Sequence, residues 1–368
     1  MTIYDKRLAT LKSYMEENNI QTAMIHDPEN VFYYTGFLSN PHERFMGFFI
    51  DLAKDQTKFF VPALDRDAAE EATGLQGIVP ISDEQLPFEV VKEHLPHVSG
   101  TLGLEDRSIN YERIKLLQNT FPNIELANIQ PFINDERKQK SPEEIVLLKE
   151  ALRIIEEVYA EGVKQIKVGM TESEVVGLLE TLMRKFGADG PSFSTIVLAG
   201  EKSALPHGSP GERVLAEGDF LLIDFGVIKD GYCSDITRTF VMGEATERQQ
   251  EIYDIVKRSN EAGIAAVKGG EPLKNFDIAA RKVIDDAGYG EYFNNRVGHG
   301  LGIGLHEEPS VHMKNEEIAK PGYVFTIEPG IYIQGWGGVR IEDTVYIDEN
   351  GECVVLSSYP KELASINN

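Results

Sequence analysis

The 368-residue chain has few cysteines and few basic residues. Its two cysteines, Cys233 and Cys353, form no CxxC pair, which argues against a disulfide framework or a thiolate zinc site. Lysine and arginine number 36 against 60 aspartates and glutamates, so the formal net charge is −24. Because phosphate binding needs a basic surface, nucleic acid and anionic membrane are poor candidates for partners.

Long apolar runs are also missing. The first 20 residues lack a basic start followed by an apolar core, and no later run approaches the length of a membrane span. We therefore expect a cytoplasmic protein with no membrane contact. The hydrophobic fraction of 42%, with 18 phenylalanines and 14 tyrosines, is ample for large packed cores. The length corresponds to about two domains.

The first third of the chain alternates helix and strand signals. Apolar residues recur at helical spacing over 4–18, and further helices are expected at 87–95 and 110–119. Short apolar runs predict strands at 21–28, 46–51, 58–64, 77–82 and 100–106. This pattern predicts an α/β domain with a mixed or parallel sheet. A charged segment, NDERKQKSPEE, then marks a boundary, so we expect domains at 1–133 and 134–368.

The second part opens with a strong helix start. Ser141 is the expected N-cap, Pro142 takes the first helical position and Glu144 closes a capping box. Thr171 and Glu174 form a second capping box. Later helices are predicted at 246–267 and 276–286, and strands at 193–199, 214–228, 231–243, 323–333 and 338–347. The whole chain is thus of the α/β (α+β) class.

A weak internal repeat links two of these strands. Residues 218–226 and 322–330 share one pattern, in which a glycine is followed by five residues, an acid, one residue and a second glycine. The acids are Asp224 and Glu328, and a second acid follows each on the next strand. The repeat predicts two related halves that face each other across a pseudo-twofold axis.

Five residues of this part are spaced to hold metal ions. They are Asp224, Asp235, His299, Glu328 and Glu342, each in or beside an apolar strand such as LLIDFG or FTIEPG. One buried acid is commonly protonated or paired with lysine or arginine. Four acids and a histidine together favour bound cations, because ionised groups in apolar surroundings need a partner.

Hairpin geometry brings these acids together in pairs. A turn centred on Lys229 and Asp230, with Gly231 at positive φ, would place Asp224 opposite Asp235. A loop near Gly335 would bring Glu328 to Glu342 in the same way. Directly opposed carboxylates destabilise a sheet unless a cation lies between them. Five such ligands suit two divalent ions about 3.5–4 Å apart. The oxygen-rich set favours Mn²⁺, with Co²⁺ and Zn²⁺ as alternatives.

Three further residues are candidates for chemistry beside the metals. His306 lies seven residues after His299 in a glycine-rich segment and can reach the same cavity, or else it is a surface histidine. That segment is no dinucleotide fingerprint, because HEEP follows where a helix should open. His207 lies in a loop between two prolines. Arg340 should share the site-facing side of its strand with Glu342 and orient carboxylates there.

These motifs resemble those of a known enzyme family. PHGSPG, LLIDFG, SDITRTF, GHGLGIGLHEEP, FTIEPGIY and GVRIEDTV are similar to segments of the pita-bread metallopeptidases, which include prolidase, Xaa-Pro aminopeptidase and methionyl aminopeptidase. DPENVFYYTGF resembles the creatinase-like N-terminal domain of the prolyl-specific branch. The compact chain is most similar to bacterial Xaa-Pro dipeptidases (prolidases). The resemblance implies a creatinase-like domain followed by a pita-bread catalytic domain.

The resemblance also implies a mechanism. Two metal ions would activate a water molecule that cleaves the Xaa-Pro bond of a dipeptide, with Glu328 as general base. His207 or His306 would polarise the carbonyl and Arg340 would support the ligands. The small peptide substrate, with proline at its second position, would be the partner of a cytoplasmic homodimer.

A dipeptidase must also hold the substrate's terminal carboxylate. Arg296 is one candidate, and His42 and Arg44 in the loop 39–45 are others, in their own or a partner subunit's site. Some relatives place an arginine shortly after the position of His306, but no Arg or Lys occurs here before Lys314. Two alternatives therefore stay open, a Xaa-Pro aminopeptidase acting on longer peptides and a catalytically inactive peptide-binding protein.

Overall fold

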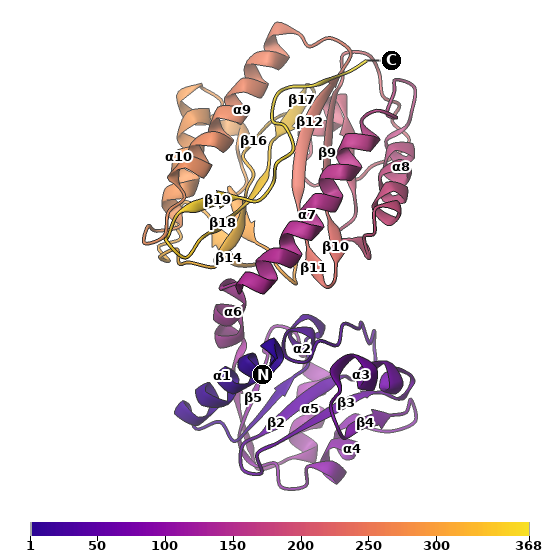
Figure 1. Ribbon diagram of the computed structural model, residues 1–368, viewed down its shortest axis with the longest axis vertical. Helices are drawn as coiled ribbons and strands as arrows, with labels where there is room; N and C mark the ends of the chain where they lie inside the picture. The colour runs from indigo at the N-terminus through magenta and orange to yellow at the C-terminus, as the bar shows by residue number, and fades with distance from the viewer. Residues whose placement is uncertain (1, 368) are drawn as a thin grey trace. The chain divides into compact units, whose positions relative to one another are not determined.

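The computed structural model describes residues 2–367, and the chain divides into two compact units after Asp135 (Figure 1). The division falls inside helix α6 (Gln130–Lys138). Among the described residues, no helix is both long and apolar enough to cross a membrane.

The N-terminal unit is built on a six-stranded mixed sheet in the order β4-β3-β2-β1-β5-β6. Its strands are β1 (Thr22–Ile25), β2 (Gly47–Asp51), β3 (Gln56–Pro62), β4 (Ile78–Ile81), β5 (Gly100–Leu104) and β6 (Ile124–Asn128). Its helical segments before α6 are α1 (Ile3–Glu17), α2 (Pro28–Thr35), η1 (Ala63–Asp65), α3 (Arg66–Thr73), α4 (Pro87–His94) and α5 (Tyr111–Thr120). The mixed α/β domain expected from the sequence is confirmed.

The sequence pattern missed α2, α3 and β6, and it extended one strand too far. The strand expected at 21–28 ends at Ile25, because Asp27 caps a helix whose first residue is Pro28. The Asp27 carboxylate accepts the amides of Glu29 and Asn30, so the chain turns into α2 at this point.

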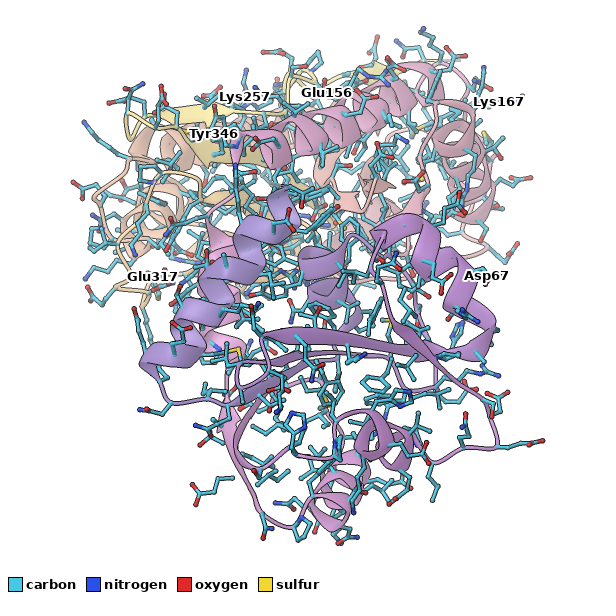
Figure 2. The ribbon with its side chains drawn as sticks, turned by 60° about the horizontal axis from the view of Figure 1, so that its bottom comes forward. Asp67, Glu156, Lys167, Lys257, Glu317 and Tyr346 are labelled. Carbon is cyan, nitrogen blue, oxygen red and sulfur yellow. The ribbon has the colours of Figure 1, made fainter. Side chains whose placement is uncertain are left out.

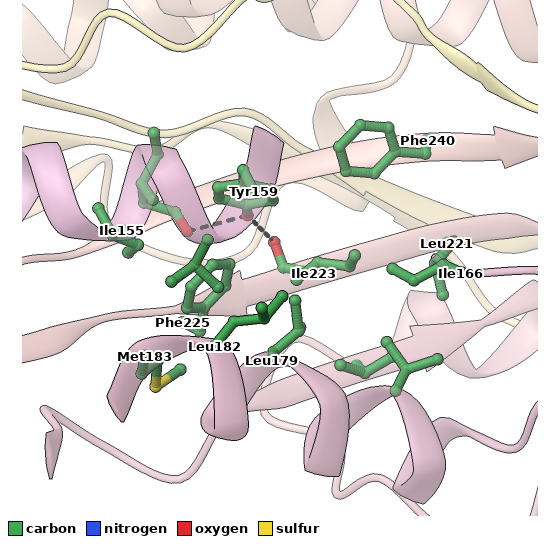
Figure 3. Close-up of a cluster of buried hydrophobic side chains, with 14 of the residues drawn as sticks. Ile155, Tyr159, Ile166, Leu179, Leu182, Met183, Leu221, Ile223, Phe225 and Phe240 are labelled. Carbon is green, nitrogen blue, oxygen red and sulfur yellow. Dashed lines mark hydrogen bonds between the residues drawn. The ribbon is translucent and has the colours of Figure 1, made fainter. Parts of the chain in front are cut away.

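The first half of the second unit packs two helices on an antiparallel sheet. Helices α7 (Pro142–Gly162) and α8 (Glu172–Lys185) begin at the two predicted capping boxes. They cover β8 (Ile196–Ala199), β9 (Phe220–Phe225) and β12 (Ile236–Met242). Tyr159 of α7 is fully buried, and its hydroxyl lies 2.7 Å from the Ile223 carbonyl and 3.3 Å from the Ile236 carbonyl (Figure 3). These two contacts fix α7 against β9 and β12, the strands of the first hairpin.

The second half repeats the plan. Helices α9 (Glu247–Ala266) and α10 (Lys274–Asp286) pack against β15 (Val324–Ile327), β16 (Gly330–Ile333), β17 (Gly337–Arg340) and β18 (Asp343–Ile347). Phe276 of α10 stacks on Phe325 of β15 with ring centroids 5.7 Å apart. The remaining elements are β7 (Gly190–Pro191), η2 (Gly200–Ala204), β10 (Val227–Lys229), β11 (Tyr232–Cys233), η3 (Gly290–Tyr292), β13 (Gly298–Gly300), β14 (Glu307–Val311), β19 (Cys353–Val355) and β20 (Ser365–Ile366). Each half thus sets a helix pair against a hairpin that carries two acids, as the repeat predicted.

The register of the first hairpin differs from the prediction by two residues. Asp224 pairs with Thr237 rather than with Asp235. The turn is centred on Asp230 and Gly231, both at positive φ, because these two residues accept the left-handed backbone of a tight hairpin turn. Side chains alternate between the two faces of a sheet with a period of two. A shift of two residues therefore keeps Asp224, Thr237 and Asp235 on the same face.

The strand expected at 214–228 starts late, at Phe220. Gly218 lies just before it at a φ of 82°, in a turn that ends the preceding loop. The second hairpin follows the prediction. Its pairs Ile327–Asp343 and Gly330–Arg340 share one register, which centres the loop on Gly335.

Candidate metal centre and active-site cavity

One cavity of about 620 Å³ in the second unit gathers most of the predicted site residues. The five predicted metal ligands, Asp224, Asp235, His299, Glu328 and Glu342, all line it. Arg296, Arg340, His207 and His306 line it as well. Only His42 and Arg44 of the predicted set do not.

The first acid pair comes from the β9–β12 hairpin. Asp224 is the penultimate residue of β9, and Asp235 lies just before β12. Both are buried, with exposed fractions of 8% and 4%. The Asp224 carboxylate accepts a hydrogen bond from the Arg340 guanidinium, and Asp235 Oδ2 lies 3.5 Å from His299 Nε2.

The second acid pair lies where a hairpin passes from one sheet to another. Pairing of β15 with β18 ends at Ile327 and Asp343, and pairing of β16 with β17 starts again at Gly330. Glu328 and Glu342 therefore stand opposite each other in the gap. Their amides bond outward, from Glu328 to the Val297 carbonyl at 2.7 Å and from Glu342 to the Thr237 carbonyl at 3.1 Å. These bonds tie the second hairpin, at the acid pair, to β12 and to the residue that precedes β13.

His299 is held as a neutral imidazole. Its Nδ1 lies 3.1 Å from the Gly300 carbonyl, so Nδ1 carries the proton and Nε2 keeps its lone pair. Nε2 lies 3.4 Å from Glu328 Oε1 and 3.5 Å from Asp235 Oδ2. Burial, and then the charge of the neighbouring His306, lower the pKa of His299 to about 3. This is the protonation state in which histidine binds metals.

The chemistry of the cluster fits a cation. Within the described part of the chain, Asp224 Oδ1, Asp235 Oδ1 and Glu342 Oε1 are buried without a hydrogen-bond partner. Ligand atoms of Asp235, His299 and Glu342 all lie within 4.8 Å of one another. Burial, followed by repulsion from neighbouring carboxylates, raises the pKa of Asp235 and of Glu342. A bound cation would relieve both the missing bonds and the repulsion.

Residues outside the predicted set hold these ligands in place. Thr237 Oγ1 donates to Glu342 Oε2 at 2.7 Å and accepts from Arg340 Nε at 3.1 Å. Arg340 also donates to the Tyr332 hydroxyl at 2.9 Å. In the second half, Thr326 Oγ1 donates to Glu328 Oε1 at 3.3 Å. Thr237, Thr326 and Tyr332 were not predicted from the sequence. Thr237 and Thr326 each lie two positions from a predicted ligand and so share its face of the strand, which is the signal that could have found them.

The two histidines outside the ligand set lie on loops at the cavity. The His306 ring meets the His299 ring edge-on, with centroids 4.1 Å apart and planes at 72°. Burial, and then the charge of Arg296, lower the pKa of His306. His207 lines the cavity together with its neighbours Pro206 and Gly208. Arg296 donates to Ser310 Oγ at 2.9 Å.

His42 and Arg44 belong to the N-terminal unit. They line a cavity of about 750 Å³ whose other lining residues all come from that unit. Arg44 is engaged there with Asp83, donating from Nε at 2.8 Å and from a terminal nitrogen at 3.1 Å.

Two family models together match most of the chain. The model described as "Metallopeptidase family M24" matches residues 146–349, and "Creatinase/Prolidase N-terminal domain" matches residues 7–139. The Bacillus subtilis protein YkvY is 41% identical over 361 residues, which cover 97% of this chain and 99% of that one.

Two solved structures show the same architecture. The Xaa-Pro dipeptidase from Bacillus anthracis has a TM-score of 0.90 and 32% identity, covering 98% of this chain and 99% of its own. The X-Pro aminopeptidase from Thermotoga maritima has a TM-score of 0.89 and 31% identity, covering 97% and 99%. The likeness confirms the creatinase-like and pita-bread domains expected from the sequence. The chain belongs to metallopeptidase family M24, a family of metal-dependent hydrolases, and carries the creatinase/prolidase N-terminal domain.

Proposed function

We propose that this protein is a Xaa-Pro dipeptidase that uses two divalent ions. The observation that carries the proposal is a cluster of four carboxylates, three of them buried, and a neutral histidine at the wall of a cavity of about 620 Å³. Three oxygens of the cluster lack a hydrogen-bond partner among the described residues. The Xaa-Pro dipeptidase of Bacillus anthracis, similar over nearly the whole chain, supports the choice of substrate.

The ligands would be Asp224, Asp235, His299, Glu328 and Glu342. Five side chains from two hairpins and one strand can surround two ions when some carboxylates bridge them. Because four of the five ligands offer oxygen, Mn²⁺ is the proposed metal, with Co²⁺ or Zn²⁺ as alternatives.

The two ions, when bound, would lower the pKa of a water molecule and polarise the substrate carbonyl. Glu328 is the proposed base that receives the water's proton at Oε. Its side chain is 17% exposed, against 6% for Asp235, so water can reach it. His207 and His306 reach the cavity from loops and would donate a hydrogen bond to the carbonyl oxygen as negative charge develops there. Arg340, bound to Asp224, keeps that carboxylate in place.

The substrate's terminal carboxylate needs a cation. Arg296 lines the cavity and is the proposed partner within the catalytic unit. His42 and Arg44 remain a second proposal, in which the loop 39–45 limits substrate length in its own or a partner's site. The setting that we propose is a homodimer in the cytoplasm.

A second candidate function is Xaa-Pro aminopeptidase activity on longer peptides. A shallower groove of about 390 Å³ shares Phe193, Ser194 and Pro210 with the lining of the cavity. The groove therefore adjoins the cavity and offers room beyond a dipeptide.

Peptide length separates the two functions. With added Mn²⁺, the proposed dipeptidase should cleave Leu-Pro and leave Leu-Pro-Pro intact, and metal analysis should find two ions per chain. Cleavage of the tripeptide at a comparable rate would establish the aminopeptidase instead. If neither peptide is cleaved with Mn²⁺, Co²⁺ or Zn²⁺, the proposed activity is wrong. Arg44→Ala tests the loop 39–45, which has no role in substrate length if dipeptide cleavage and tripeptide refusal both persist.

A further inference from the structure

The loop that carries His306 closes around a buried ion cluster. Glu307, the next residue, has a side chain only 9% exposed and faces two cations of the linker segment. Arg137 donates to Glu307 Oε2 at 2.5 Å. The Lys140 ammonium, 1% exposed, lies 2.6 Å from Glu307 Oε1 as an ion pair without hydrogen-bond geometry. All three side chains belong to the catalytic unit.

The same carboxylate also bonds the backbone of the loop. The Gly304 amide donates to Glu307 Oε2 at 3.2 Å, so the chain between Gly300 and Glu307 curls over the carboxylate. At Gly302 an added Cβ would lie 2.5 Å from Glu307 Oε1 and 2.9 Å from Lys140 Cε, which shows how closely backbone and ion cluster approach. The ion cluster therefore shapes the loop. In the sequence, His306 lies between Gly304 and Glu307, the two residues that the hydrogen bond joins.

The linker itself is anchored to the catalytic unit. Gln139 forms an antiparallel bridge with Tyr323, and the Lys140 amide donates to the Gly322 carbonyl at 2.9 Å. Gly322 and Tyr323 directly precede β15, the strand that leads to Glu328. The linker backbone that carries Arg137 and Lys140 is thus hydrogen-bonded to the segment that enters β15, and the two side chains bind Glu307 from there. Broken buried ion pairs are strongly destabilising, so the cluster resists displacement of the loop.

We propose that Glu307, held by Arg137 and Lys140, is a positioning residue that sets the imidazole of His306 edge-on to His299 in the cavity. The inference rests on the proposed function, because His306 must act on a substrate for its placement to matter. It goes beyond that function by giving the linker between the two domains a part in the site. The Glu307 carboxylate contacts Arg137, Lys140 and the Gly304 amide, none of which is a predicted ligand, and it takes no proton in the reaction.

The neighbouring ion pair of the linker offers a matched control. Lys138 donates to Glu317 Oε1 at 2.7 Å, and the Tyr323 hydroxyl donates to the same oxygen at 2.6 Å. Glu317 is labelled in Figure 2 and follows β14, so in the sequence it lies beyond the loop 300–307. Glu317→Gln therefore removes one negative charge that pairs with another cation of the same linker, and it should leave turnover within about 2-fold of the parent.

The test is a double-mutant cycle with His306. In the parent, Glu307→Gln should lower kcat about 10-fold or more, the scale of residues that orient an active-site group, with KM and metal content little changed. In the His306→Ala background the same change should alter kcat by less than about 2-fold, because the group being positioned is gone. An equal loss in both backgrounds, or no loss in the parent, would overturn the inference.

Hydrogen exchange gives a second measurement that does not depend on activity. In metal-free protein, peptides covering 300–307 should exchange faster in Glu307→Gln than in Glu317→Gln, because the Gly304 amide loses its carboxylate partner. Unchanged hydrogen exchange in these peptides would overturn the positioning role of Glu307 even if activity fell. If Glu307→Gln does not fold, Lys140→Met keeps the Arg137 pair and should show the same cycle with a smaller loss. A parent without any Xaa-Pro cleavage refutes the proposed function, whereas an active parent with an additive cycle refutes only this inference.

Discussion

The two units of the chain bury carboxylates in opposite ways. In the N-terminal unit Glu105 is fully buried, and its oxygens accept hydrogen bonds from the Asn30 side chain at 2.7 Å and from the His26 amide at 2.6 Å. In the catalytic unit Asp235 and Glu342 are almost as deeply buried, yet each has an oxygen without a partner in the described chain. A buried acid that meets donors has a structural role. A group of acids in which several oxygens have no donor among the described residues is suited to a cation.

The cause of each perturbed pKa follows the same division. Burial raises the pKa of Glu105 to about 7, and its hydrogen-bond donors oppose the rise. Burial also raises the pKa of Asp235, but there the next cause is repulsion from Glu342, which adds to the rise. A proton can neutralise the single buried charge of Glu105. Several neighbouring acids, as at Asp235 and Glu342, favour a divalent ion instead.

Removing one carboxylate from the site should have the largest effect. Asp235→Asn should lower turnover of Leu-Pro by roughly 1000-fold, because bound metal stabilises the transition state by several kcal/mol and each 1.36 kcal/mol is tenfold. Metal analysis should show lost ions. The control is Asp51→Asn in the N-terminal unit, where Asp51 is bonded to His97 and Gln56. Full activity and both ions in Asp235→Asn would remove it from the ligand set.

The buried acid of the N-terminal unit should make that unit sensitive to pH. The pKa of Glu105 rises from 4.5 to about 7 on folding, so its contribution is complete below pH 4.5 and is lost as pH rises towards 7. The loss amounts to about 3 kcal/mol at 1.36 kcal/mol per pKa unit. Relative to the parent, Glu105→Gln should gain protection against hydrogen exchange in β1 and β5 over this range. A difference that is independent of pH would show that Glu105 is ionised in the folded protein.

Loss of a loop histidine should cost less than loss of a ligand. His207→Ala should lower kcat by roughly 100-fold, as expected when one donor to a developing oxyanion is removed. Metal content should stay at the parent level, since His207 lies outside the ligand cluster. Steady-state kinetics and metal analysis of the same preparation check both statements. A loss of metal would instead make His207 part of the metal centre.

The smallest effect should be on the stability of the metal-free protein. Here a substitution should stabilise the fold, whereas most substitutions destabilise it. Glu342→Gln removes a buried charge while keeping an oxygen able to accept from Thr237. It should stabilise the metal-free form by about 1–3 kcal/mol, the cost of a buried polar atom left unsatisfied. Thermal unfolding in a chelator measures this, and added Mn²⁺ should raise the parent Tm more than that of the variant. A lower Tm for Glu342→Gln in chelator would place the carboxylate among structural acids such as Glu105.

Local rules explain which features the sequence could predict. The capping boxes at Ser141 and Thr171 were recoverable because an N-cap and its partner lie three residues apart. The facing of Glu328 and Glu342 was recoverable because a symmetrical loop fixes the register. The register of Asp224 was wrong by two because several turns could join its strands, and the choice of Asp230 and Gly231 depends on their backbone conformation.

Long-range contacts explain what the sequence could not predict. Thr237 and Tyr332 both bond Arg340, but Tyr332 belongs to a different hairpin from Thr237. Glu307 lies 170 positions from Arg137, so no local sequence pattern predicts their ion pair. The relation of Arg44 to substrate stays a prediction, since its own unit pairs it with Asp83.

The sequence by itself determined which residues could bind a metal ion. The number and type of the acids, their place in apolar strands and the histidine between the hairpins were enough to indicate bound metal, because burial of like charges is costly whatever the fold. Only the tertiary structure decided how those residues are used. It showed which oxygens lack partners among the described residues, which nitrogen of His299 is free, and that Arg137 and Lys140 pair with Glu307 beside His306. These facts depend on side chains brought together from distant positions, and such contacts are fixed by packing rather than by local sequence.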